Sequence, residues 1–126
     1  MSNKISATIE IKRWEEEPFD EGAGIAKLTR ASVEKVYSGD ITGTSATESL
    51  MAYAPDETAS FVGIDRIKGT VWGMTGTLVL QHVGTFEDGV ATASLTVLTG
   101  TDQLEGATGA GDFVADPQPS LILSLD

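Results

Sequence analysis

The sequence predicts an all-β fold, a single eight-stranded antiparallel β-barrel, on three observations. Two runs rich in β-branched and apolar residues flank Asp88-Gly89. Asp-Gly in that position is the strongest short-range hairpin signal, because both turn residues take φ > 0. Residues 4–15 alternate between apolar and polar side chains, as a half-buried strand does. The rest of the chain divides into short runs with turn residues between them, a spacing that favours a sandwich or a barrel. Eight antiparallel strands close readily into a barrel that holds side chains or one small ligand.

Each element is predicted from its own local pattern. The first strand has apolar residues at the odd positions from 5 to 11 and is predicted to stop at Pro18, before an acidic loop over residues 18–24. The second strand, residues 25–37, is β-branched but also charged, so a helix over residues 29–36 is the competing prediction. A loop is predicted at residues 99–103. Further strands are predicted at residues 41–54, 59–71, 76–86, 90–97, 106–114 and 120–125.

Composition limits the possible functions. The chain has 126 residues, which predicts one domain over residues 1–126. It has no cysteine, which excludes disulfides, thiolate metal sites and cysteine nucleophiles. The formal net charge of −11 argues against nucleic-acid and anionic-membrane partners, because both need a cationic protein surface. The first ten residues lack the apolar core of a signal peptide, and no run approaches the ~20 apolar residues of a membrane helix, so we expect a cytoplasmic protein.

His82 is the most informative polar residue, because it is the only histidine in the chain. It shares strand parity with Leu78, Leu80 and Phe86, so it is predicted to lie on the more apolar face and to point into the barrel. There it would be a general acid or base whose pKa is tuned by burial. The alternative is a core histidine that a backbone carbonyl or a carboxylate satisfies. Phe86 is predicted to border the same cavity.

Three charged residues are candidate partners of His82. Glu48 and Arg66 each have apolar residues at the neighbouring positions of the same parity, so both can face inward within reach of His82. Arg30 is a further member of this set. Buried charges need partners, and the alternative is a solvated outer face or a structural ion pair. The predicted ligand-binding residues are therefore His82, Glu48, Arg66, Arg30 and Phe86, with no catalytic residue assigned.

No motif predicts a cofactor or a metal ion. The glycine spacing at residues 106–111 is reversed from the dinucleotide fingerprint, and no helix follows. The acidic residues at 15–17, 20 and 21 lack the spacing of a calcium loop. One histidine without any cysteine gives no zinc-binding pattern. No G-x-S-x-G elbow is present, so the sequence gives no support to a hydrolase triad.

Several motifs together resemble a bacterial protein family. They are Lys27-Leu-Thr-Arg-Ala-Ser, Leu50-Met-Ala-Tyr, Thr58-Ala-Ser-Phe-Val-Gly, Leu80-Gln-His-Val-Gly-Thr-Phe and Leu104-Glu-Gly-Ala-Thr-Gly-Ala-Gly. The family is a domain of unknown function whose fold is like that of allene oxide cyclase, an eight-stranded barrel related in shape to plant dirigent proteins. The resemblance runs over nearly the whole chain and implies the same barrel. It implies no activity, since a cyclase role carried over from the fold would be analogy only.

Three functions are consistent with these patterns. The first is a binding module that holds one small apolar or aromatic molecule inside the barrel. The second is an isomerase- or cyclase-type enzyme in which His82 or Glu48 moves a proton. The third is a structural protein with a filled barrel, which a cavity of ~300 Å³ or more would exclude. Apolar residues on both faces of residues 79–83, and at Ile122, further predict self-association as a dimer or a trimer.

Overall fold

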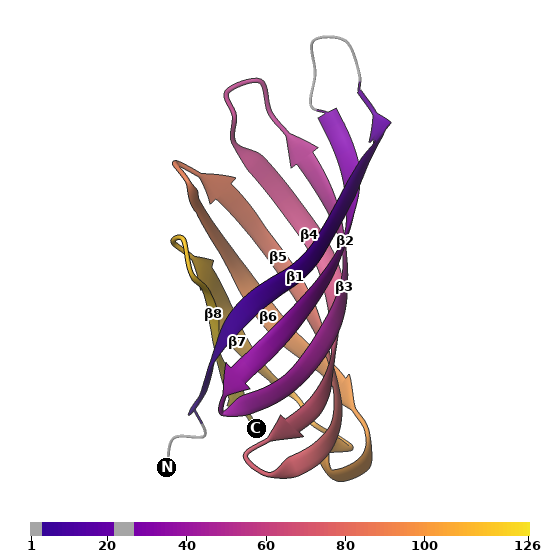
Figure 1. Ribbon diagram of the computed structural model, residues 1–126, viewed down its shortest axis with the longest axis vertical. Helices are drawn as coiled ribbons and strands as arrows, with labels where there is room; N and C mark the ends of the chain where they lie inside the picture. Colours follow the sequence, from indigo (N-terminus) through magenta and orange to yellow (C-terminus); the bar gives the residue numbers. More distant parts are fainter. Residues whose placement is uncertain (1–3, 22–26) are drawn as a thin grey trace.

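The chain folds into a closed barrel of eight antiparallel strands that follow one another in chain order (Figure 1). This computed structural model describes residues 4–21 and 27–126. The all-β, eight-stranded antiparallel barrel predicted from the sequence is confirmed. Within the described ranges, no helix has the length and apolar character needed to cross a membrane. The elements are β1 (Lys4–Asp20), β2 (Lys27–Gly39), β3 (Ile41–Tyr53), β4 (Ala59–Val71), β5 (Met74–Glu87), β6 (Val90–Gly100), the short helix η1 (Asp102–Leu104), β7 (Gly109–Ala115) and β8 (Pro119–Leu125).

The first two strands differ from their predicted boundaries. β1 continues through Pro18 to Asp20 instead of stopping at Pro18. β1 pairs with β8 only over residues 4–8, so in the described part of the chain one edge of the later β1 has no strand partner. A proline, which has no N–H to donate, is tolerated at such an edge. β2 is a strand over its whole length, so the competing helix over residues 29–36 is wrong. The predictions for residues 22–26 lie outside the described residues.

The connection between β6 and β7 also differs from the prediction. β6 extends to Gly100, and the helix η1 replaces part of the predicted loop. The glycine-rich strand begins at Gly109 rather than at residue 106. Gly106 has φ of +79°, a left-handed conformation that belongs to a turn and that glycine adopts without strain.

The barrel is packed solid at one end and hollow at the other. Alternate residues of each strand point inward, and those near the end of the barrel where β1 begins and β8 ends form the hydrophobic core (Figure 1). Each fully buried leucine or isoleucine stabilises the folded state by about 1.5–3 kcal/mol. The core at this end therefore stabilises the barrel, and the other half can contain a cavity. The core residues are Ile5, Ala7, Ile9, Tyr37, Ile41, Ile67, Val71, Leu78, Leu80, Leu95, Val97, Leu104, Leu121 and Leu123.

A β-bulge in β1 turns Trp14 toward the interior. Ile11 pairs with Lys35 of β2, but Arg13 already pairs with Glu34, so Lys12 is an extra residue in the ladder. The extra residue reverses which parity faces inward. Ile11 and Trp14 therefore both line the cavity, although simple alternation would put them on opposite faces.

Candidate functional site

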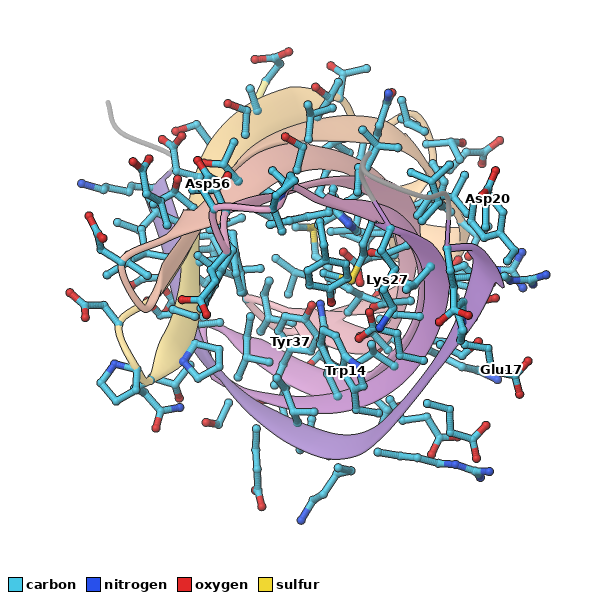
Figure 2. All side chains as sticks on the ribbon, turned by 90° about the horizontal axis from the view of Figure 1, so that it is seen from above. Trp14, Glu17, Asp20, Lys27, Tyr37 and Asp56 are labelled. Atoms are coloured by element: carbon cyan, nitrogen blue, oxygen red, sulfur yellow. The ribbon has the colours of Figure 1, made fainter. Side chains whose placement is uncertain are left out.

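The hollow half of the barrel contains a cavity of about 390 Å³. Its wall is mostly apolar and carries aromatic side chains from six of the eight strands. Figure 2, which looks along the barrel, shows Trp14 and Tyr37 inside the ring, whereas Glu17 points away from it. The aromatic residues of the lining are Trp14, Tyr37, Tyr53, Phe61, Phe86 and Phe113.

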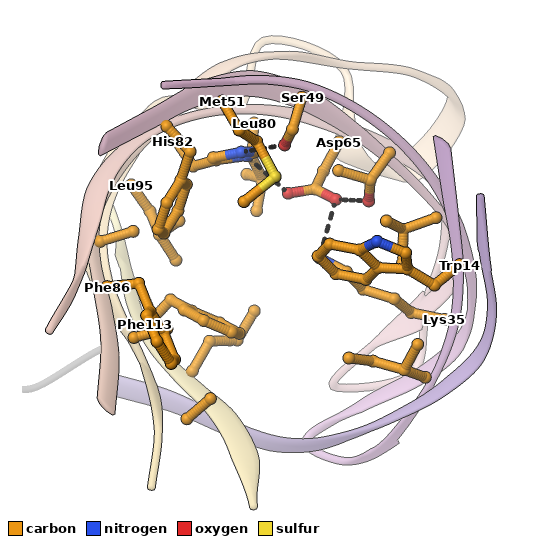
Figure 3. Close-up of a pocket in the computed structure, with 18 of the residues that line it drawn as sticks. Trp14, Lys35, Ser49, Met51, Asp65, Leu80, His82, Phe86, Leu95 and Phe113 are labelled. Atoms are coloured by element: carbon orange, nitrogen blue, oxygen red, sulfur yellow. Dashed lines mark hydrogen bonds and ion pairs between the residues drawn. The ribbon is translucent and has the colours of Figure 1, made fainter. Parts of the chain in front are cut away.

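A chain of three polar side chains crosses one wall of this cavity (Figure 3). The Oγ atom of Ser49 on β3 lies 2.7 Å from Nε2 of His82 on β5. On the other side of the ring, Nδ1 of His82 lies 3.3 Å from Oδ2 of Asp65 on β4. A carboxylate accepts and does not donate, so the ring proton belongs on Nδ1, and Nε2 accepts the hydrogen bond from the Ser49 hydroxyl. All three side chains are buried.

Gly63 makes the contact between Ser49 and His82 possible. These two residues lie on strands that are separated by β4, and Gly63 pairs with both of them. Neighbouring strands are ~4.8 Å apart, so the two side chains must meet across the backbone of β4. A Cβ atom at position 63 would lie 2.7 Å from Cε1 of His82 and 2.8 Å from Oγ of Ser49. The missing side chain at Gly63 therefore leaves the space in which the hydrogen bond forms.

Asp65 is held as a carboxylate by several partners. Its Oδ1 accepts hydrogen bonds from Nζ of Lys35, at 3.2 Å, and from the hydroxyl of Thr47. Burial alone would raise the pKa of Asp65. The hydrogen bond from His82, the positive charge of Lys35 and the Thr47 hydroxyl outweigh burial and lower the pKa to about 2. The site therefore contains a fixed negative charge, with an ammonium group on one side and an imidazole on the other.

A second polar cluster lies at the open end, around Glu16. Its carboxylate accepts hydrogen bonds from Nε1 of Trp14 at 2.9 Å, from Oγ1 of Thr29 at 2.6 Å and from the hydroxyl of Tyr53. Burial opposes ionisation of Glu16, but these three donors and the charge of Lys27 lower its pKa overall. Burial and the Glu16 carboxylate raise the pKa of Tyr53 to about 12. This cluster fixes Trp14 and Tyr53, two aromatic side chains of the cavity lining.

The structure places two of the five predicted ligand-binding residues at the cavity. His82 points into the barrel and is 6% exposed. Phe86, from the same strand, also lines the cavity, and Phe61 contacts the imidazole ring with 5.7 Å between ring centroids.

The other three residues lie on the outer surface, so the expectation that Glu48 or Arg66 lies within reach of His82 is wrong. The inward parity of β3 and β4 is the odd one, which contains Ser49 and Asp65. Glu48 instead forms an ion pair with Arg30, with 2.6 Å between Oε1 and Nη2, and both side chains are exposed to solvent.

Sequence reasoning missed Ser49 and Asp65, the actual partners of His82. A signal was present in β4, where Arg66 and Lys68 share one parity and Asp65 is the single charge on the other. Two charges at alternate positions are typical of a solvated face. The odd positions of β4, which include Asp65, are therefore favoured as the inward-facing ones. Among the described residues, no group of three or more histidine, cysteine or acidic side chains is arranged to hold a metal ion.

Comparisons with known proteins agree with this architecture. The chain is similar to the crystal structure of a protein of unknown function from the DUF3224 family of Shewanella oneidensis MR-1, with 25% identity and a TM-score of 0.82 over 100% of this chain and 97% of that chain. It is also similar to a solved structure named pyocyanin demethylase, with 13% identity and a TM-score of 0.66 over 98% of this chain and 99% of that chain, a likeness that shows the fold alone.

No curated protein matches the sequence. A family described as "Protein of unknown function (DUF3224)" matches residues 5–126. The match covers nearly the whole chain, as the resemblance of the sequence motifs implied. The chain therefore belongs to the DUF3224 family.

Proposed function

We propose that the protein binds one small, largely apolar, ring-containing molecule inside the barrel. The observation that carries this proposal is the cavity of about 390 Å³, walled by aromatic side chains, with the Ser49, His82 and Asp65 side chains on one side. Small-molecule sites typically measure ~300–1,000 Å³ and combine an apolar lining with a few convergent polar groups. A barrel filled by its own side chains, the structural alternative, would leave no such volume.

The cavity also suggests the size and orientation of the ligand. A volume of about 390 Å³ lies near the lower end of the range for small-molecule sites and suits a ligand of one to three rings. The polar groups lie on one wall, so a hydroxyl or carbonyl group of the ligand is expected to face Ser49 and His82. The aromatic side chains of the remaining wall would then contact its apolar body.

A neutral fluorescent probe, N-phenyl-1-naphthylamine, tests the binding proposal. We expect saturable binding by the wild-type protein with one probe per barrel. Ala91→Trp should weaken binding at least tenfold, because residue 91 lines the cavity and the indole would fill it. The matched control is Thr92→Trp at the next residue, which is exposed on the outer face and should bind as the wild type does. Equal binding by all three proteins, or no saturable binding, would refute the proposal.

A second candidate function is an enzyme in which His82 transfers a proton to or from the bound molecule. The observation that favours it is the orientation of the imidazole, which Asp65 holds at Nδ1 while the ring faces the cavity. Glu48, the other acid–base candidate from the sequence, lies outside the barrel and is not proposed. The name pyocyanin demethylase for a protein of the same fold is compatible with an enzymatic role for such a barrel.

The enzymatic candidate is tested with small molecules extracted from cells that produce the protein. Mass spectrometry should reveal a compound that wild-type protein consumes and His82→Gln does not, although both bind the naphthylamine probe. A compound that both proteins retain without change would leave binding as the function.

A further inference from the structure

The order of the polar groups on the cavity wall is hydroxyl, imidazole, carboxylate. Ser49 Oγ lies 2.7 Å from Nε2 of His82, and Nδ1 of His82 lies 3.3 Å from Asp65 Oδ2. This is the order in which a base and an orienting acid activate a serine for nucleophilic attack. The constellation is recognised by geometry and not by sequence position, so the missing G-x-S-x-G elbow does not exclude it. Here the three groups come from three consecutive strands, β3, β4 and β5.

The hydrogen bonds also set the protonation state that a nucleophile needs. Asp65 is kept ionised by Lys35 and Thr47, so it accepts the Nδ1 proton of His82. Nε2 then has a free lone pair directed at the hydroxyl of Ser49. The oxygen lone pairs of Ser49 remain available on the cavity side, because its own proton is donated to His82.

Packing alone does not require this arrangement. Burying a hydroxyl, an imidazole and a carboxylate costs free energy, and apolar residues of similar volume would often be at least as stable. The barrel nevertheless aligns the three polar side chains at the cavity. The absence of a side chain at Gly63 allows Ser49 and His82 to meet.

We propose that Ser49 is a nucleophile that takes the acyl group from a small apolar ester bound in the cavity. This rests on the proposed binding function, because the ester must enter the barrel. Ser49 Oγ attacks the ester carbonyl carbon, and its proton passes to Nε2 of His82. The ester C–O bond breaks, and the leaving alkoxide takes that proton and departs as an alcohol. Water then attacks the acyl-serine, gives a proton to Nε2, and releases the acid and free Ser49 when that proton returns to Oγ.

Lys35 places a positive charge on the cavity wall, where it is ion-paired with Asp65. Among the described residues that line the cavity it is the one lysine, and no arginine is present there. Its Nζ lies beside Asp65 and 5.6 Å from the ring centroid of Phe113, so it is held within the wall. The charge of Lys35 therefore holds the carboxylate that orients the imidazole of His82.

Phenylmethanesulfonyl fluoride, a small aromatic reagent for activated serines, tests this assignment on the intact protein. Attack by Ser49 forms an S–O bond and breaks the S–F bond, and fluoride leaves together with the serine proton. We expect one adduct per chain by mass spectrometry, located at Ser49 by peptide mapping and lost in Ser49→Ala. His82→Gln should react at least 100-fold more slowly. Ser45→Ala, a change at another buried serine of β3, should react as the wild type does.

Two further measurements test the role of Ser49 as a nucleophile separately from ligand binding. The labelling rate of the wild type must level off at high pH, as it does when a bound base removes the serine proton, whereas the rate for an unactivated serine would keep rising with pH. This test needs no variant to fold. Binding of N-phenyl-1-naphthylamine, measured on the same samples, reports the cavity separately. Probe binding without an adduct at Ser49, or an adduct that forms equally fast in His82→Gln, would overturn the nucleophile while leaving the binding function intact. Absence of probe binding would instead count against the binding function.

Discussion

Gly63 is the residue on which the Ser49–His82 hydrogen bond depends. An added Cβ atom would lie 2.2 Å from the backbone oxygen of Glu48, which cannot move without shifting β3. We expect Gly63→Ala to lower the free energy of unfolding by about 1–3 kcal/mol, as overpacking does, and to abolish labelling of Ser49. Urea denaturation and mass spectrometry measure the two effects.

The matched control for Gly63 is Gly73, where an added Cβ atom meets nothing within 4 Å. Its φ of +79° is strained for alanine, so Gly73→Ala should cost about 1–2 kcal/mol and leave labelling unchanged. Normal labelling of a folded Gly63→Ala protein would show that the glycine is not needed for the contact.

Asp65 should make the free energy of unfolding depend on pH in the acidic range. Its pKa in the folded protein is about 2, below the ordinary 3.8, so folding favours the ionised form. The resulting stabilisation is fully present above pH 4 and is lost as the pH falls from about 4 to about 2, a change on the order of 2 kcal/mol. Asp65→Asn should remove this acid dependence. At pH 7 it should also be a few kcal/mol less stable, because Lys35 is left buried and unpaired.

Urea denaturation at pH 7, 4 and 2 provides the measurement. Asp112→Asn is the control, because Asp112 is exposed on the outer face. A wild-type protein as stable at pH 2 as at pH 4 would contradict the prediction.

The sequence was sufficient to orient His82 but not to identify its partners. His82 shares its parity with Leu78, Leu80 and Phe86, which makes that face of β5 the more apolar one, although Val79 and Val83 lie on the other. In β3 both parities mix polar and apolar residues, so alternation alone does not decide which one faces inward. The answer depends on the register with the neighbouring strands, which pairs Gly63 with both Ser49 and His82. Register is a property of the whole sheet and is not visible within one strand.

At the scale of the elements, the β5–β6 hairpin depends on its two turn residues. Asp88 has φ of +54° and Gly89 has φ of +80°, as the Asp-Gly pair predicted. Gly89→Val should lower stability by about 1–2 kcal/mol, because a β-branched residue is strained there. Asp88→Asn should have little effect, since asparagine tolerates the left-handed region. Thermal denaturation of both variants measures the difference, and equal melting temperatures would show that the turn does not limit stability.

β1 shows why strand ends are harder to predict than strand interiors. Alternation over its first half is regular and was recognised. The bulge at Lys12 and the passage through Pro18 depend on β1 leaving β8 after five residue pairs while continuing along β2. These features are set by barrel closure, which brings together segments distant in sequence. Trp14 consequently reaches the cavity, a position that local pattern could not assign.

At the scale of the whole molecule, self-association remains a prediction. Leu50, Val62 and Val83 pair across β3, β4 and β5 in one row and are each about half exposed. A second copy of the chain would bury this row, so we expect a dimer or trimer in sedimentation analysis, well above 13.2 kDa. Val83→Lys places a charge in this row and should dissociate the dimer or trimer into monomers. Thr44→Lys, an exposed position farther along β3, should not. A wild-type protein that sediments only as a monomer at high concentration would refute the prediction.

The closed ring also imposes an order on the folding reaction. Seven of the eight strand pairs in the ring join strands that follow one another in the chain. The eighth, between β1 and β8, joins residue 4 to residue 124. Loop-closure entropy grows with the length of chain enclosed, so the hairpins can form early and the ring closes last. The β1–β8 strand pair has five residue pairs, whereas the β3–β4 pair has thirteen. The backbone amides that join residues 4–8 to residues 120–124 should therefore exchange hydrogen with solvent faster than those joining β3 to β4, because the last strand pair to form is the first to open.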